Sequence, residues 1–309
     1  MFITRYKNKG DQLFSVASFA ASISILLVLL GVWSVLLYES GLAIKTFGFF
    51  RFIGSSEWNP GNEQFGALIP LTGTIITTLM ALLIAVPVSF GIAIFIVEIC
   101  PTPLKTGFGV AVELLATIPS IIFGMWGFYR LAPIMGEVIE PALQKMFIGA
   151  PLIGRLFTGT PLGIDVLTAS VILSIMIIPF IASIIRETIQ LVPEVLKESA
   201  YSVGATKWEV IKDIVIPYSK QGIYGGIIIA LGRALGETMA VAFVLGAKHK
   251  FATSFFDATS TITVTLVNEF TQANSDIYYS SLVYLALILF AVNFIALSVA
   301  RLLMLKRRK

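Results

Sequence analysis

Six long apolar segments constrain the fold of this chain more than any other feature. They run over approximately residues 13–38, 67–97, 107–129, 162–185, 222–246 and 281–304. Each is long enough to cross the hydrocarbon core of a bilayer as a helix, which takes about 20 residues. Only 13% of the residues are charged, about half the share that is typical of soluble domains. The sequence therefore predicts an all-α polytopic membrane protein with six transmembrane helices.

The basic residues indicate how this membrane domain is oriented. Several of them precede the first apolar segment, as in a secretory signal, but that segment exceeds the roughly 7–15 residues of a signal core and lacks a convincing cleavage site. We therefore expect an uncleaved extra span at 13–38 and a core at 67–304, both within one transmembrane domain over 1–309. Lys and Arg are about twice as frequent on one side of the membrane, which places both termini in the cytoplasm.

The composition also excludes several classes of function. The net charge of +4 does not indicate a nucleic-acid partner, because the basic residues cluster at span ends, where they report orientation and face lipid headgroups. The single cysteine, Cys100, and the single histidine, His249, have no neighbours at metal-ligand spacing, and we expect His249 to be solvated in a loop. The sequence contains no evident nucleophile with a base and no phosphate loop. We therefore predict no catalytic residue, no metal site and no ATPase activity in this chain.

The third segment carries the first candidate functional residues. Glu113 lies near its inner end, and the Pro119–Ser120 step follows six residues later. A proline within a helix removes a backbone hydrogen bond and favours a kink, so Pro119 and Ser120 are candidates for gating, with packing geometry as the alternative. Glu113 is a candidate pathway residue, or it extends to the interface as long charged side chains do.

A charged segment at 186–221 is predicted to fold as two short amphipathic helices on the cytoplasmic side. Gly204 is placed to end the first helix in a left-handed turn. Thr206 and Glu209 form the capping-box pattern at the start of the second, and Pro217 marks its predicted limit. The spacing alone is compatible with a surface hairpin that only joins two spans.

Two charges fall inside the fifth apolar segment, in GRALGE. Arg233 and Glu237 are four residues apart, which predicts that they share one face of a continuous helix, about one turn apart. Because charges in hydrocarbon are costly, we expect both to face the bundle interior or a wet cavity. The forked donors of Arg233 suit a phosphate oxyanion, and Glu237 could hold the guanidinium in place. The alternative is an ion pair with a purely structural role.

The cytoplasmic segment resembles the EAA loop of ABC importer permeases, whose pattern is EAA, three residues, Gly, nine residues and I-x-L-P. The chain has Glu198-Ser199-Ala200 and Gly204 at the matching positions and departs at Ser199 and Ile216. The resemblance implies that Glu198, Ser199, Ala200 and Gly204 belong to a coupling helix that docks on a separate ATPase subunit.

Four further segments make the chain similar to the PstC-type permeases of phosphate ABC importers. They are Leu83–Glu98, Glu113–Gly127, Ile172–Ser183 and Gly232–Val241. This resemblance implies a type I ABC importer permease fold in the bacterial inner membrane, with Arg233 and Glu237 in the substrate pathway. It also implies three partners, namely a second PstA-like permease, a dimeric PstB-like ATPase that binds ATP and Mg, and a soluble PstS-like phosphate-binding protein. This chain itself would hold no cofactor.

Three alternatives remain open at the level of sequence. A permease for another oxyanion could use the same scaffold, and a PstA-type permease carries an EAA loop as well. An ion-coupled secondary transporter would also place a charged pair at mid-membrane, but it would need neither the EAA spacing nor an ATPase.

Overall fold

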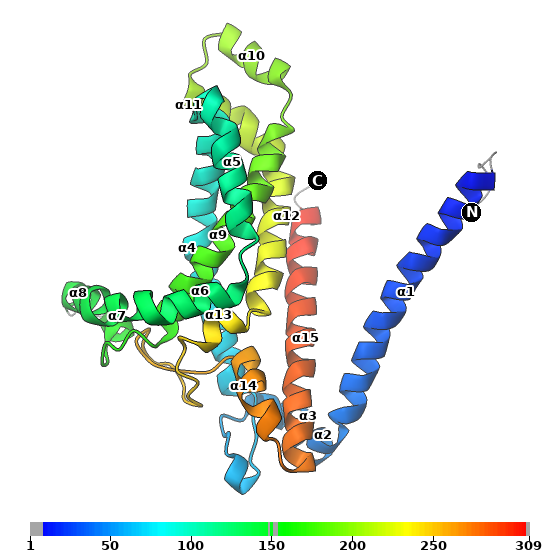
Figure 1. Cartoon of the computed structure of the whole chain (residues 1–309), viewed down its shortest axis with the longest axis vertical. Helices are drawn as coiled ribbons and strands as arrows, with labels where there is room; N and C mark the ends of the chain where they lie inside the picture. The colour runs from blue at the N-terminus through cyan, green and yellow to red at the C-terminus, as the bar shows by residue number, and fades with distance from the viewer. Residues whose placement is uncertain (1–8, 148, 151–153, 307–309) are drawn as a thin grey trace.

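The computed structural model describes residues 9–147, 149–150 and 154–306, and the regular elements within these ranges are all helical. Five helices are long and apolar enough to cross a membrane, or six if one bent pair counts as a single span. The start of α1 and the end of α15 lie in the half of the molecule that carries α10 (Figure 1). The predicted all-α membrane fold is confirmed, while the count of six spans depends on how the bent pair is assigned.

The first helix stands apart from the rest of the bundle (Figure 1). Helix α1 (Lys9–Glu39) has no buried residue. It approaches α15 (Asp276–Lys306) through the rings of Trp33 and Phe290, 6.1 Å apart. The short helices α2 (Gly41–Phe47) and α3 (Phe49–Gly54) then fold back on α15, where the Ala43 N–H donates to Ser280 Oγ and the Tyr284 hydroxyl donates to the Phe49 carbonyl.

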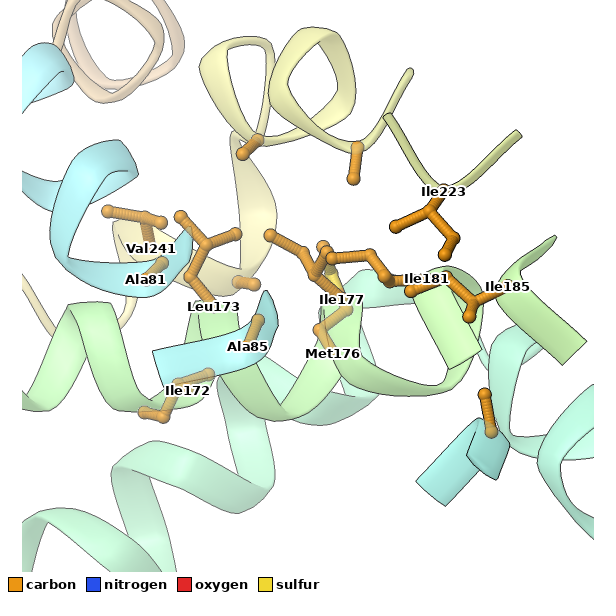
Figure 2. Close-up of a cluster of buried hydrophobic side chains, with 14 of the residues drawn as sticks. Ala81, Ala85, Ile172, Leu173, Met176, Ile177, Ile181, Ile185, Ile223 and Val241 are labelled. Carbon is orange, nitrogen blue, oxygen red and sulfur yellow. The ribbon is translucent and has the colours of Figure 1, made fainter. Parts of the chain in front are cut away.

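Helix α9 (Val166–Gln190) forms the centre of the bundle. Its apolar side chains pack against Ala81 and Ala85 of α4 (Leu68–Ile94), as Figure 2 shows. The α9 residues in this cluster include Ile172, Leu173, Met176, Ile177, Ile181 and Ile185. Alanines on one helix that face large aliphatic side chains on the other allow close packing, which is the main source of attraction between helices in lipid.

Helix α12 (Ile216–Leu235) packs on the other side of α9 through small residues. A methyl group added at Gly222 would overlap Thr188, and one at Gly226 would overlap Ile184. The pair Gly222 and Gly226 therefore permits the close approach to a neighbouring span that small residues at this spacing predict.

The third predicted span, 107–129, is not one continuous helix. Helix α5 (Thr102–Ala116) ends before Pro119, and the helical run from α6 (Ser120–Trp126) to Phe147 leaves it at 87°. Pro119 lacks an N–H and takes an extended ψ of 137° as the N-cap of α6. The run after α6 contains a π-helical turn (Gly127–Leu131), α7 (Ala132–Ile134), a second π turn (Met135–Ile139) and α8 (Glu140–Phe147).

Short elements connect the long helices. They comprise the 3-10 turns Pro60–Asn62, Gly154–Phe157 and Phe270–Gln272, and the helices α13 (Met239–Ala242) and α14 (Ile262–Glu269). The sequence suggests an outward loop with little regular structure over 247–280, but the irregular stretch 247–261 is followed by α14, the turn Phe270–Gln272 and the start of α15. It likewise suggests a turn-rich surface loop over 39–66, but that region contains α2 and α3, with Phe52 fully buried.

The expectation of a solvated His249 is wrong. Its side chain is only 20% exposed, its ring stacks on Trp58 at 5.3 Å, and its Nε2 lies 2.7 Å from a Glu269 carboxylate oxygen. Trp58 Nε1 and the Tyr278 hydroxyl donate to the other oxygen of Glu269. Burial raises the pKa of Glu269, but these hydrogen bonds lower it overall below the ordinary value of 4.5. The cluster ties the segment before α4 to α14 and α15.

Candidate functional site

The hairpin formed by the two short helices within 186–221 has the local geometry that its sequence predicts. Helix α10 (Glu194–Ser202) is followed by Gly204 with φ of +89°, in the left-handed region. Helix α11 (Lys207–Val210) begins with the complete capping box of Thr206 and Glu209. The capping contacts join residues within three positions of one another, so the sequence alone can predict them.

The predicted limit at Pro217 is wrong. After α11 the chain widens into a π turn (Ile211–Val215), in which the Ile216 N–H donates to the Ile211 carbonyl, and then continues directly as α12. Pro217 sits at the start of α12, where a missing N–H is tolerated. The second hairpin helix and the transmembrane helix therefore form one continuous helical element, so a movement of the hairpin acts directly on α12.

The candidate coupling residues lie on the exposed part of this hairpin. Glu198 and Ser199 are exposed, Ala200 is half-buried against the core, and nothing lies within 4 Å of a Cβ built at Gly204. Large apolar side chains beside them are uncovered, including Val195, Val203 at 85% exposure and Trp208. Contiguous exposed apolar surface of this kind marks a contact site for another molecule.

One side chain of α10 points the other way. Lys197 is the only buried residue of this helix, at 6% exposure. Its Nζ lies 2.8 Å from Glu98 Oε1, in the π turn Phe95–Ile99 that ends α4, and 3.2 Å from Glu194 Oε1. Burial lowers the pKa of Lys197, but the hydrogen bonds and charges of Glu98 and Glu194 raise it overall above the ordinary value of 10.5. Sequence reasoning missed this pair because the two residues are 99 positions apart.

Glu113 has a partner that its sequence context does not indicate. Arg186 of α9 donates to its carboxylate, with the Arg186 side chain 11% exposed and that of Glu113 50% exposed. Gly109, one turn earlier on α5, leaves room for the guanidinium, because a methyl group there would overlap Arg186 Nη1. Glu113 therefore links α5 to α9, whereas Pro119 and Ser120 lie at the break between α5 and α6.

Arg233 and Glu237 do not share a face of one helix, so that expectation is wrong. Helix α12 ends at Leu235, Gly236 caps it, and Glu237 lies outside. Glycine is about 1 kcal/mol less favourable than alanine within a helix, and Glu237 Oε1 instead accepts the Ala240 N–H at 3.2 Å, at the start of α13. The Glu237 carbonyl accepts a hydrogen bond from Thr263.

The Arg233 guanidinium contacts an aromatic ring instead of a carboxylate. Its guanidinium carbon lies 5.0 Å from the centroid of Phe180 on α9, a cation–π contact. None of the ion pairs among the described residues includes Arg233. The structure thus gives no support to a structural Arg233–Glu237 ion pair, and it leaves a half-buried arginine whose charge no described carboxylate neutralises.

The chain is similar to known proteins over most of its length. Residues 70–309 match the family described as binding-protein-dependent transport system inner membrane component. The chain is similar to the phosphate transport system permease protein PstC of Mesorhizobium japonicum, with 51% identity over 96% of this chain and 90% of that protein. It is also similar to the PstC protein of Pasteurella multocida, with 46% identity over 93% of this chain and 89% of that protein.

A solved structure shows the same fold at low sequence identity. It is a bacterial alginate ABC transporter in complex with an alginate pentasaccharide-bound periplasmic protein. The TM-score is 0.60 with 18% identity, over 94% of this chain and 93% of that chain. At this identity the likeness concerns the fold alone.

Proposed function

Because the chain belongs to the family of binding-protein-dependent transport system inner membrane components, we propose that it is a permease subunit of an ATP-driven ABC importer for inorganic phosphate. The observation that carries the substrate is the 51% and 46% identity to two proteins named phosphate transport system permease protein PstC, each over at least 93% of this chain. The chain is a transport component, and ATP hydrolysis belongs to a separate subunit.

The exposed hairpin supports the docking of that ATPase. Val203 and Trp208 present apolar surface beside Glu198 and Gly204, at the end of the molecule that carries α10 (Figure 1). A dimeric PstB-like subunit that binds ATP and Mg would cover this surface, and this chain would hold no cofactor of its own. The direct continuation of the hairpin into α12 gives its movement a path into the membrane.

The other partners follow from the same family assignment. A second, PstA-like permease would complete the pathway, and a soluble PstS-like protein would deliver phosphate to the outer face. The protein would lie in the bacterial inner membrane with both termini cytoplasmic. The start of α1 and the end of α15 lie in the same half as the hairpin, which supports this orientation (Figure 1).

Arg233 is the residue that we assign to the anion. An arginine within a membrane bundle is costly unless it is paired or meets a charged substrate, and Arg233 has no described carboxylate partner. Stacking on Phe180 holds the guanidinium while its forked donors remain suited to phosphate oxygens. We assign Glu237 to the pathway as well, although here its carboxylate holds the turn that leads into α13.

Transport in reconstituted vesicles tests this function. The chain would be assembled with its second permease, ATPase and binding protein, and ATP-dependent uptake of labelled phosphate would be measured with arsenate and sulfate as competitors. We expect vanadate to block uptake and arsenate to compete better than sulfate. Uptake that is driven by a proton gradient and resists vanadate would refute an ABC importer, and stronger competition by sulfate would refute phosphate as the substrate.

Arg233→Gln tests the assigned anion contact in the same assay. It should abolish uptake while the complex still assembles with the ATPase, because the guanidinium is lost and the helix is retained. Lys220→Gln is a matched control, since it removes a positive charge from an exposed position on the same helix. If Arg233→Gln reduces the yield of complex without a transport defect, Arg233 has a structural role instead.

A further inference from the structure

A buried ion pair between Lys197 and Glu98 joins the hairpin helix α10 to the transmembrane bundle. Among its nine residues, Lys197 alone is buried, while apolar side chains such as Val195 face outward. The Lys197 and Glu98 side chains are 7% and 8% exposed. Glu194 also contacts Lys197, but its side chain is 75% exposed. The buried contact is therefore the one that joins α10 to α4.

A buried ion pair is a poor means of gaining stability. Removing a lysine and a glutamate from water has a desolvation cost that can exceed their attraction, and apolar side chains of similar volume often serve as well. Removing one partner of such a pair, however, leaves an uncompensated charge inside the protein and is strongly destabilising. Lys197 and Glu98 therefore hold α10 in one position relative to the end of α4.

The α4 side of the contact is itself anchored. Glu98 lies in the π turn that ends α4, Ile96 and Val97 of that turn are buried, and Lys105 donates to the Val97 carbonyl. From there α4 packs along the central helix α9 (Figure 2). A displacement applied at Glu98 thus acts on a helix that runs through the core of the bundle.

We propose that the Lys197–Glu98 ion pair is a positioning link that transmits movement of α10 to α4, separately from the continuous helix that leads from the hairpin into α12. This inference rests on the proposed function, because the movement of α10 is supplied by the ATPase. Neither residue contacts the substrate. Their role is to keep ATP hydrolysis and the opening of the pathway in step.

The test compares coupling and local motion in the reconstituted complex. Lys197→Met keeps the apolar stem of the side chain and removes the lysine charge that pairs with Glu98. Glu98→Gln removes the buried carboxylate and leaves Lys197 with only the exposed Glu194. Each should raise the ATP consumed per phosphate imported severalfold, because the removed partner leaves a buried charge uncompensated. Each should also speed hydrogen exchange of the α10 amides in the nucleotide-free complex. If both variants keep the parental ATP-to-phosphate ratio, or both keep the parental hydrogen-exchange rate of the α10 amides, the proposed link is overturned.

Reversing the two charges distinguishes the loss of a specific ion pair from a general destabilisation of the fold. The triple variant Lys197→Glu, Glu98→Lys and Glu194→Gln reverses the ion pair, and Glu194→Gln avoids a new repulsion with the introduced glutamate. It should return the ATP consumed per phosphate imported and the hydrogen-exchange rate of the α10 amides toward the parental values. Glu194→Gln alone is the matched control and should behave as the parent, because it removes only the exposed contact. If the charge-reversed variant fails to restore the ATP consumed per phosphate imported or the hydrogen-exchange rate of the α10 amides, the proposal is overturned.

The two proposals fail in different ways. If the parental complex imports no phosphate with ATP, the proposed function is refuted, and hydrogen exchange of the α10 amides still decides whether the ion pair holds α10 in position. If the parent imports phosphate and the single variants stay coupled, only the link is refuted.

Discussion

The left-handed turn at Gly204 allows a quantitative test of the hairpin. Its φ is +89°, and a Cβ built there meets no atom within 4 Å. Gly204→Ala therefore introduces backbone strain of about 1–2 kcal/mol without steric overlap inside this chain. This is small against the roughly 5–15 kcal/mol that stabilises a typical protein, so the variant should fold and assemble. It should disfavour the native turn by about 5–30-fold.

We expect Gly204→Ala to lower ATP-dependent phosphate uptake severalfold in reconstituted complex, with the yield of complex unchanged. Gly204→Asn is the matched comparison, because asparagine adopts the left-handed conformation more readily than alanine although it is larger. Uptake should therefore fall in the order glycine, asparagine, alanine.

The opposite order would refute the reasoning from backbone strain. If Gly204 is required because the partner subunit approaches closely, the larger asparagine will be worse than alanine. Parental uptake by Gly204→Ala would show that the turn is not needed in this conformation at all.

Three further changes test the packing and charge of the bundle. Glu269→Gln should remove part of the pH dependence of the free energy of unfolding. The lowered pKa of Glu269 contributes stability that is present above about pH 4.5 and is lost as the pH falls through the lower pKa of the folded state. The melting temperature in detergent should therefore fall less steeply with decreasing pH in the variant than in the parent. Gly73→Ala should destabilise the packing of α4 against the segment before α14 by about 1–3 kcal/mol, because its methyl would overlap the Ser260 carbonyl oxygen. An unchanged melting temperature would contradict this contact. Gly109→Ala should displace the Arg186 guanidinium and increase the trypsin sensitivity of that region, whereas parental cleavage would show that the side chain simply shifts.

Short-range patterns predicted the hairpin well. Thr206 and Glu209 form their capping box, and Gly204 adopts the left-handed turn, because both depend on residues a few positions apart. The apolar segments likewise predicted the long helices, since about 20 apolar residues suffice to span a bilayer wherever they occur. The limit at Pro217 failed because a π turn immediately before it accommodates the proline within a continuing helix.

The candidate pathway residues show where the four-residue rule stops being valid. The spacing of Arg233 and Glu237 places them on one face only if the helix continues. The helix ends at Leu235 with Gly236 as its cap, and the Glu237 carboxylate accepts a hydrogen bond from the Ala240 N–H. The position of Arg233 over Phe180 could not be predicted, because the ring comes from a different helix.

The sequence by itself determined the class of the protein, the positions of most long helices, the hairpin geometry and the family to which the chain belongs. These depend on local periodicity, capping and motif spacing. Only the tertiary structure decided that Lys197 meets Glu98, that Arg186 meets Glu113, and that His249 is enclosed with Glu269. Each of these contacts joins different elements of the chain, and side chains become neighbours in this way only when helices pack, which no spacing within one element encodes.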